Sequence, residues 1–143
     1  MDDFNIASLT ECRNEYTSLL ISKITPLVVQ GINSIFKEAY QLCVENEEED
    51  KYLMTFQNFL MRIHKWNNDI VEKETNRIIQ DSKCSFLEEL LTCVHITQMK
   101  ILTTMRVSSK QKKIDIDIPS LSIFIHNVYT IVSRKVYKNV YLY

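Results

Sequence analysis

A chain of 143 residues is long enough for one domain with a self-sufficient core, and its 45% hydrophobic and 24% charged residues lie in the globular range. One glycine and two prolines exclude collagen-like and low-complexity chains, and also a glycine-rich phosphate loop. They argue equally against an all-β fold, which needs many glycine- and proline-assisted turns. The composition therefore predicts a single helical domain over residues 1–143.

The formal net charge is only −1, but the charges are unevenly distributed. Residues 1–99 hold nine Lys and Arg against sixteen Asp and Glu, whereas residues 100–143 hold eight against two. This asymmetry is typical of an acidic body with a basic partner-binding end. It also fits a chain whose two ends attract each other in the folded state, and both interpretations stay open.

The predicted first helix begins at a capping box formed by Ser8 and Glu11. Apolar residues then recur every three or four positions as far as Cys43, which indicates one helical face. Pro26 interrupts this run because it lacks the amide that would bond to Ser22, so the helix should kink or restart there. The acidic residues that follow Cys43 should form a solvated turn.

Apolar periodicity predicts a second helix over 52–63. A break should follow at 66–69, because Trp66 precedes two asparagines and an aspartate, which cap helices well and continue them poorly. We expect Trp66 to bury against the bundle and to brace this corner. A third helix should then place Ile70, Val71, Ile78 and Ile79 inward.

A second capping box, Ser85 with Glu88, opens a predicted long helix through Arg106, and an exposed basic loop follows it. Strict alternation of isoleucine and aspartate predicts a short extended segment near 114–118, laid over the helices. Pro119 and Ser120 should start the last helix.

Five to six amphipathic helices with short connections predict an all-α fold, a single helical bundle. Its predicted core positions lie centrally on five apolar stripes, at Leu20, Val28, Phe56, Leu60, Leu91, Val94, Phe124 and Val128. The last helix should also turn Leu121, Ile125, Ile131, Val132 and Val136 inward.

The cysteines and histidines give no pattern typical of catalysis or of a metal site. Cysteines 12, 43, 84 and 93 form no C-x-x-C pair, and the acidic start of the chain is unlike a secretory signal. We therefore expect free, largely buried thiols in a reducing compartment and a protein that is not secreted. Histidines 64, 95 and 126 have no ligand-like spacing. No membrane span, catalytic residue, cofactor or metal site is predicted, and the chain is not expected to be an enzyme.

Basic residues interleaved with aromatic ones mark the C-terminal third. The candidate partner-binding face comprises Arg134, Lys135, Tyr137, Lys138, Tyr141 and Tyr143. Tyr and Arg anchor protein interfaces, so an acidic protein partner is expected there. The alternative is that the terminal tyrosines fold back onto the bundle while the lysines are solvated. A second basic group could contact nucleic acid instead, through Arg106, Lys110, Lys112 and Lys113.

Short motifs along the chain resemble an uncharacterised protein family of nucleocytoplasmic large DNA viruses, the phycodnavirus and mimivirus group. They are Thr25-Pro26-Leu27 with Gly31, Lys65-Trp66-Asn67, 72–78 (EKETNRI), Ile118-Pro119, Phe124-Ile125-His126 with Tyr129, and the ending 138–143 (KNVYLY). The ending departs from the family pattern at Val140, where proline is expected. The resemblance implies a viral origin and no known activity, and it carries over no site residue.

Taken together, these observations predict a non-enzymatic helical interaction module of a large DNA virus, associated with the virion or the viral factory. Its partner is expected to be a protein, itself viral, and its place the host cytoplasm or the factory. The alternative is a nucleic-acid-associated protein that uses the basic C-terminal third. The sequence predicts no cofactor and leaves the oligomeric state open.

Overall fold

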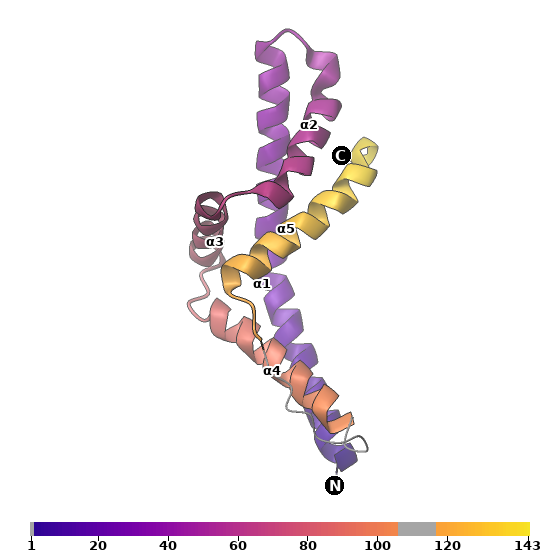
Figure 1. Ribbon diagram of the computed structural model, residues 1–143, viewed down its shortest axis with the longest axis vertical. Helices are drawn as coiled ribbons and strands as arrows, with labels where there is room; N and C mark the ends of the chain where they lie inside the picture. Colours follow the sequence, from indigo (N-terminus) through magenta and orange to yellow (C-terminus); the bar gives the residue numbers. More distant parts are fainter. Residues whose placement is uncertain (1, 106–116) are drawn as a thin grey trace.

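The computed structural model describes the backbone of residues 2–105 and 117–143, with side chains from residue 6 onward (Figure 1). Five α-helices occupy these ranges: α1 (Asp2–Glu45), α2 (Tyr52–Arg62), α3 (Asn68–Ser82), α4 (Leu87–Met105) and α5 (Leu121–Lys138). Three short 3-10 helices join or follow them: η1 (Glu49–Lys51), η2 (Ile63–Lys65) and η3 (Val140–Leu142). The described residues contain no strand, so the all-α prediction is confirmed.

The 44-residue helix α1 is the longest element, roughly 66 Å at 1.5 Å per residue. Figure 1 shows α2 running back beside the C-terminal half of α1 and α4 lying against its N-terminal half. Helix α3 also packs on α1, and α5 crosses to contact α2, η2 and α3. Helices α2, α3 and α4 therefore assemble on α1, and α5 packs on α2 and α3.

Two predictions about α1 need correction. The helix begins at Asp2, six residues before the predicted cap at Ser8, because the partly buried Ile6 and Leu9 extend its apolar stripe. It also runs through Pro26, so of the kink or restart predicted there the restart is wrong. Packing on both sides of the exposed Pro26 holds the helix together despite the missing backbone bond. Figure 1 shows the helix axis bending along its length.

Asparagine and serine cap two helices as their sequence positions predict. Asn67 accepts a hydrogen bond from the Ile70 amide at 2.9 Å and starts α3, which confirms the break at 66–69. Ser120 accepts one from the Ile123 amide at 3.3 Å and starts α5. Helix α4 starts at Leu87, two residues after the predicted cap at Ser85. Of the predicted extended segment near 114–118, residues 114–116 lie outside the described residues, and the two that follow are not strand.

The predicted core is largely correct. Leu20, Val28, Phe56, Leu60 and Leu91 are at most 5% exposed, and the other three predicted positions are partly buried against the same cluster.

The predicted inward faces of α3 and α5 are wrong at two isoleucines, since Ile70 is 44% exposed and Ile131 is 53% exposed. The buried rows instead follow one side of each helix at helical spacing. They are Val71, Thr75 and Ile78 in α3, and Leu121, Ile125, Tyr129 and Ser133 in α5.

Candidate functional site

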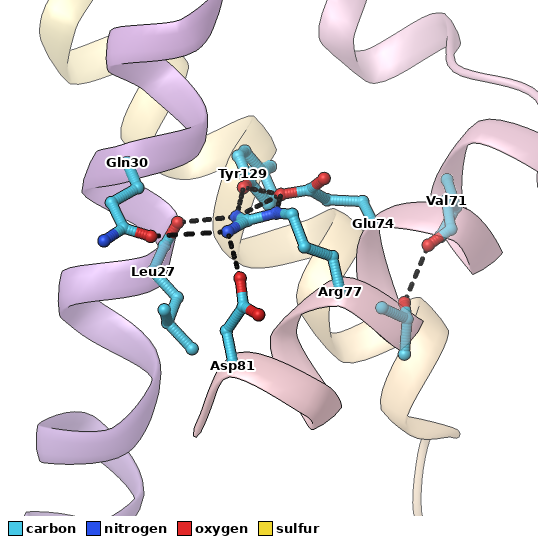
Figure 2. A network of polar contacts seen from close by, with 8 residues as sticks. Leu27, Gln30, Val71, Glu74, Arg77, Asp81 and Tyr129 are labelled. Atoms are coloured by element: carbon cyan, nitrogen blue, oxygen red, sulfur yellow. Dashed lines mark hydrogen bonds and ion pairs between the residues drawn. The ribbon is translucent and has the colours of Figure 1, made fainter. Parts of the chain in front are cut away.

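Polar side chains of α3 and α5 converge on one carboxylate beside α1 (Figure 2). The Glu74 Oε1 atom accepts hydrogen bonds from the Tyr129 hydroxyl and from Arg77 Nε and Nη2, the latter two at 3.0 and 2.5 Å. Arg77 Nη2 also donates to the Leu27 carbonyl at 2.8 Å, which ties α3 to α1. We call Glu74, Arg77 and Tyr129 the Glu74 network.

The single glycine of the chain is explained by this network. A Cβ atom at Gly31 would collide with the Tyr129 hydroxyl and would lie 2.9 Å from Tyr129 Cζ and 3.1 Å from Glu74 Oε1. Tyr129 is 1% exposed, so the ring cannot move aside. Glycine therefore permits the Tyr129 side chain of α5 to approach α1 closely, and this contact offsets the poor helix propensity of glycine.

Tyr129 and Arg77 hold their protons tightly in this network. Burial raises the pKa of the Tyr129 hydroxyl above its usual range, and the hydrogen bond to Glu74 raises it further. The hydrogen bond to Glu74 likewise raises the pKa of the Arg77 guanidinium. Neither group changes charge near neutral pH, so the arrangement suits the positioning of helices and not acid–base catalysis.

A cleft of about 500 Å³ lies beside the Glu74 network, between α1 and α3. Its lining includes Gln30, Ser34, Trp66 and Lys73. No buried side-chain nitrogen or oxygen of the described residues lacks a hydrogen-bond partner, so the cleft offers no unpaired buried group to a ligand. We therefore assign this region a structural role.

Trp66 is half-buried at the corner before α3, where it was expected to brace the bundle. Its ring stacks on His126 at 6.3 Å between centroids and 10° between planes, and it meets Tyr129 at 5.3 Å. His126 Nε2 in turn donates to the Ile63 carbonyl at 2.8 Å. The corner thus links η2 to α5, as a brace requires.

A second cavity, of about 380 Å³, lies between α2 and α5, and we call it the α2–α5 groove. Its floor and sides are formed by Leu60, Met61, His64, Thr130, Ser133, Arg134, Tyr137 and Lys138. Thr130 and Ser133 are small residues that deepen it. Their hydroxyls donate to carbonyls of their own helix, those of His126 and Thr130, at 2.9 and 2.8 Å. The floor can therefore accept apolar groups without leaving a polar atom unpaired.

Hydrogen bonds connect the two sides of the α2–α5 groove at both of its ends. Gln57 Nε2 donates to the Tyr137 carbonyl at 3.3 Å, and the bond from His126 to Ile63 joins the other end. An occupant would therefore meet a surface that is already formed, which lowers the entropy cost of binding.

The charge around the groove has one sign. Residues 51–68, which include α2, and residues 118–143, which include α5, contain no Asp or Glu. These two stretches carry Lys51, Arg62, Lys65, Arg134, Lys135 and Lys138. The rest of the chain has a net charge of −7, since the total is −1 and these six residues contribute +6. The groove is thus a basic region on an otherwise acidic protein.

The candidate partner-binding face predicted from the sequence lies partly in this groove. Arg134, Tyr137 and Lys138 line it, and Lys135 is exposed on the same helix. Tyr141 is 87% exposed. Tyr143 instead packs on Phe36 and Phe56, with centroids 5.1 Å from each, and its hydroxyl donates to Asn33. The face therefore divides into a groove and a terminal tyrosine that folds back, so the alternative is correct for Tyr143 and wrong for Tyr141.

Sequence analysis assigned only three of the eight residues that line the groove to a candidate site. Met61 and His64 on one wall, and Thr130 and Ser133 on the floor, carry no motif of their own. The available signal was the absence of acidic residues from two whole segments. Arg106, Lys110, Lys112 and Lys113, the candidate nucleic-acid contacts, lie outside the described residues.

Elsewhere the described residues gather no three His, Cys, Asp or Glu side chains that could hold a metal ion. All four cysteines are free thiols; Cys43 and Cys84 are buried. The Ile6–Glu45 part of α1 is long and apolar enough to cross a membrane by length and composition alone. A helix that runs through a protein core meets the same criteria, and α1 contributes Ile24, Val28 and Ile32 to the core.

A family model described as a family of unknown function (DUF5764) matches residues 6–143. No curated protein and no solved structure matches the chain. Its function must therefore be argued from its own geometry.

Proposed function

Because the chain belongs to the DUF5764 family, whose function is unknown, we propose a function from the groove: this is a non-enzymatic helical interaction module that binds an acidic protein partner. The observation that carries the proposal is the α2–α5 groove itself, whose lining combines apolar and exposed basic side chains, between two segments without Asp or Glu.

The chemistry of the groove favours a protein partner. Met61 is 54% exposed, and methionine adapts its shape to different apolar guests. Tyr137 and Arg134 are of the residue types that dominate protein interfaces. An acidic chain with apolar side chains would gain both burial on the floor and attraction to the basic side chains.

A viral origin belongs to the same proposal and is supported by the sequence resemblance alone. On that basis the partner is itself a viral protein, and the module acts in the host cytoplasm or the viral factory, or in the virion. Detection of the chain by mass spectrometry in purified virions, and of its coding sequence in a large DNA virus genome, would test this part.

A direct test uses two labelled polyanions of equal charge, a poly-glutamate chain and a single-stranded DNA, titrated with the full-length protein and followed by fluorescence anisotropy. The groove variant R134E/K138E reverses two exposed charges that line the cavity. The matched control K83E/K100E reverses two exposed lysines elsewhere and has the same net charge.

We expect poly-glutamate to bind the wild type and the control, and the groove variant to bind at least about tenfold more weakly, which corresponds to about 1.4 kcal/mol. Equal poly-glutamate binding by both variants would contradict the proposal. Preferential binding of DNA that the groove variant retains would favour the nucleic-acid alternative.

A further inference from the structure

The α2–α5 groove calls for an occupant that is both acidic and apolar, and this chain carries such a segment at the opposite end of α2. Residues 42–50, which we call the acidic tip, connect α1 to α2. Leu42 and Val44 are 41% and 40% exposed there. They lie beside the exposed carboxylates of Glu45, Glu47, Glu48, Glu49 and Asp50.

The backbone of the acidic tip is well defined and projects its carboxylates outward. Glu48 N donates to the Cys43 carbonyl at 2.8 Å and Glu47 N to the Val44 carbonyl at 3.1 Å, which closes the end of α1 as a Schellman motif. Lys51 pairs with Glu48 at 2.8 Å, so most of the negative charge of the tip has no cationic partner in the described residues. The tip is therefore a preformed acidic surface.

A row of exposed residues connects the acidic tip to the groove. Lys51, Met54, Asn58, Met61 and Lys65 recur every three or four positions along α2 and η2, and all five are exposed. We call this row the α2 stripe. Its two methionines are 55% and 54% exposed, and the second one also lines the groove. The tip and the groove thus lie at opposite ends of one helix face, roughly 16 Å apart along an 11-residue helix.

This order along α2 has a geometric consequence. If two copies of the chain align their α2 stripes antiparallel, the acidic tip of each copy meets the groove of the other. For Glu47 of one copy to lie opposite Met61 of the other, the two-fold axis must pass near Met54, midway between them in the sequence, so that the two copies of Met54 face each other. Both charge contacts form at once, and the interface closes on itself without leaving an unpaired tip or groove.

We propose that the α2–α5 groove binds the acidic tip of a second copy of this chain, giving a two-fold symmetric dimer through antiparallel α2 helices. The proposal rests on the groove being a protein-binding site, as proposed above, and names its occupant. An external acidic partner would then compete with the second copy for the groove.

The dimer is expected to depend strongly on salt, because its specificity comes from exposed charges of opposite sign. The Debye length falls from about 10 Å at 0.1 M to about 3 Å at 1 M ionic strength. Sedimentation velocity of the full-length protein should therefore show a concentration-dependent dimer at low salt that weakens at high salt.

A charge-swap experiment tests the pairing itself. The groove variant R134E/K138E and a tip variant, E47K/E49K, should each be monomeric, because each brings like charges together at both contacts. An equimolar mixture of the two should form a heterodimer, because acidic tip meets basic groove in one contact and basic tip meets acidic groove in the other. The control K83E/K100E should dimerise like the wild type.

Cysteine cross-linking provides a second, independent measurement of the geometry. Met54→Cys should give a disulfide-linked dimer under mild oxidation, because a residue near the two-fold axis lies beside the same residue of the second copy. Asn76→Cys, at an exposed position on α3, should not. The wild type, with its four native cysteines, sets the background.

A wild type that stays monomeric at low salt and high concentration would overturn the dimer proposal, as would a mixture of swapped variants that does not associate. The anisotropy titration separates this failure from failure of the proposed function. Poly-glutamate binding that R134E/K138E abolishes, in a monomeric wild type, would leave the groove as a binding site and reject the second copy as its occupant.

Discussion

Single residues fix how closely the helices approach each other, and Gly31 and Tyr129 are the clearest example. A glycine inside a long helix is costly unless another group packs closely against it, and the sequence alone could not identify that group. Tyr129 lies almost one hundred residues later, and only the fold brings its hydroxyl beneath α1 and onto Glu74.

Gly31→Ala tests this packing. The new methyl group would collide with a buried tyrosine, so we expect a loss of about 1–3 kcal/mol in the free energy of unfolding despite the better helix propensity of alanine. Chemical denaturation measures the change. Adding Tyr129→Phe, which removes the oxygen, should recover part of the loss; a fully additive double variant would contradict the proposed clash.

The raised pKa of Tyr129 predicts a pH dependence with a defined sign. Because the folded state keeps the phenol protonated more strongly than the unfolded state, its contribution to stability is fully present below the ordinary tyrosine pKa of about 10. It is lost as the pH rises from there through the folded-state value. Denaturation of the wild type and of Tyr129→Phe from pH 8 to 11 should therefore show the wild type losing more stability than the variant. Parallel curves would contradict the assignment.

Whole elements were predicted best where capping and apolar periodicity agree. The break after η2, the cap at Asn67 and the start of α5 follow from local chemistry that acts within three residues. The inward faces of α3 and α5 were less accurate, since Thr75, Tyr129 and Ser133 are polar residue types that tertiary contacts bury. A pattern read from apolar residues alone shifts such a face toward Ile70 or Ile131.

The end of α3 offers an element-scale prediction. Lys83 adopts a left-handed conformation with φ of 53°, which glycine adopts without a steric penalty. Lys83→Gly should raise the free energy of unfolding by about 0.5–1 kcal/mol, because relief of strain exceeds the added entropy of the unfolded chain. Thermal denaturation measures it, and Lys100→Gly, inside α4, should instead destabilise the protein by about 1 kcal/mol. Destabilisation by Lys83→Gly would show that the left-handed cap is not strained.

At the scale of the whole molecule, the C-terminal turn η3 and the residue after it are partly in the core and partly exposed to solvent. Val140 is 2% exposed and Tyr143 packs on two phenylalanines, whereas Tyr141 points to solvent. Deleting residues 140–143 should therefore lower the melting temperature by several degrees, since burial of one valine alone contributes about 1.5–3 kcal/mol. Tyr141→Ala should leave melting unchanged in the same thermal scan. An unchanged melting temperature for the deletion would mean that the terminal turn does not pack.

The distribution of charge along the chain could be predicted from the sequence, but the surface that these charges form in the folded protein could not. The basic excess of residues 100–143 was compatible with a binding end and with attraction between the two ends of the chain. Folding places α5 beside α2, a second segment without carboxylates from the acidic part of the chain, and so creates a groove that neither segment forms alone. The position of the groove depends on which helices pack together over long sequence distances, and no local sequence pattern predicts that packing.

Affinity capture from the cells that naturally contain the protein tests the central claim most directly. Wild type, R134E/K138E and K83E/K100E would be used as baits, with and without nuclease, and bound proteins quantified by mass spectrometry. We predict that the wild type and the control capture acidic proteins and that the groove variant does not. This capture should persist after nuclease treatment. Capture that is the same for all three baits, or that disappears with nuclease, would contradict a protein-binding groove.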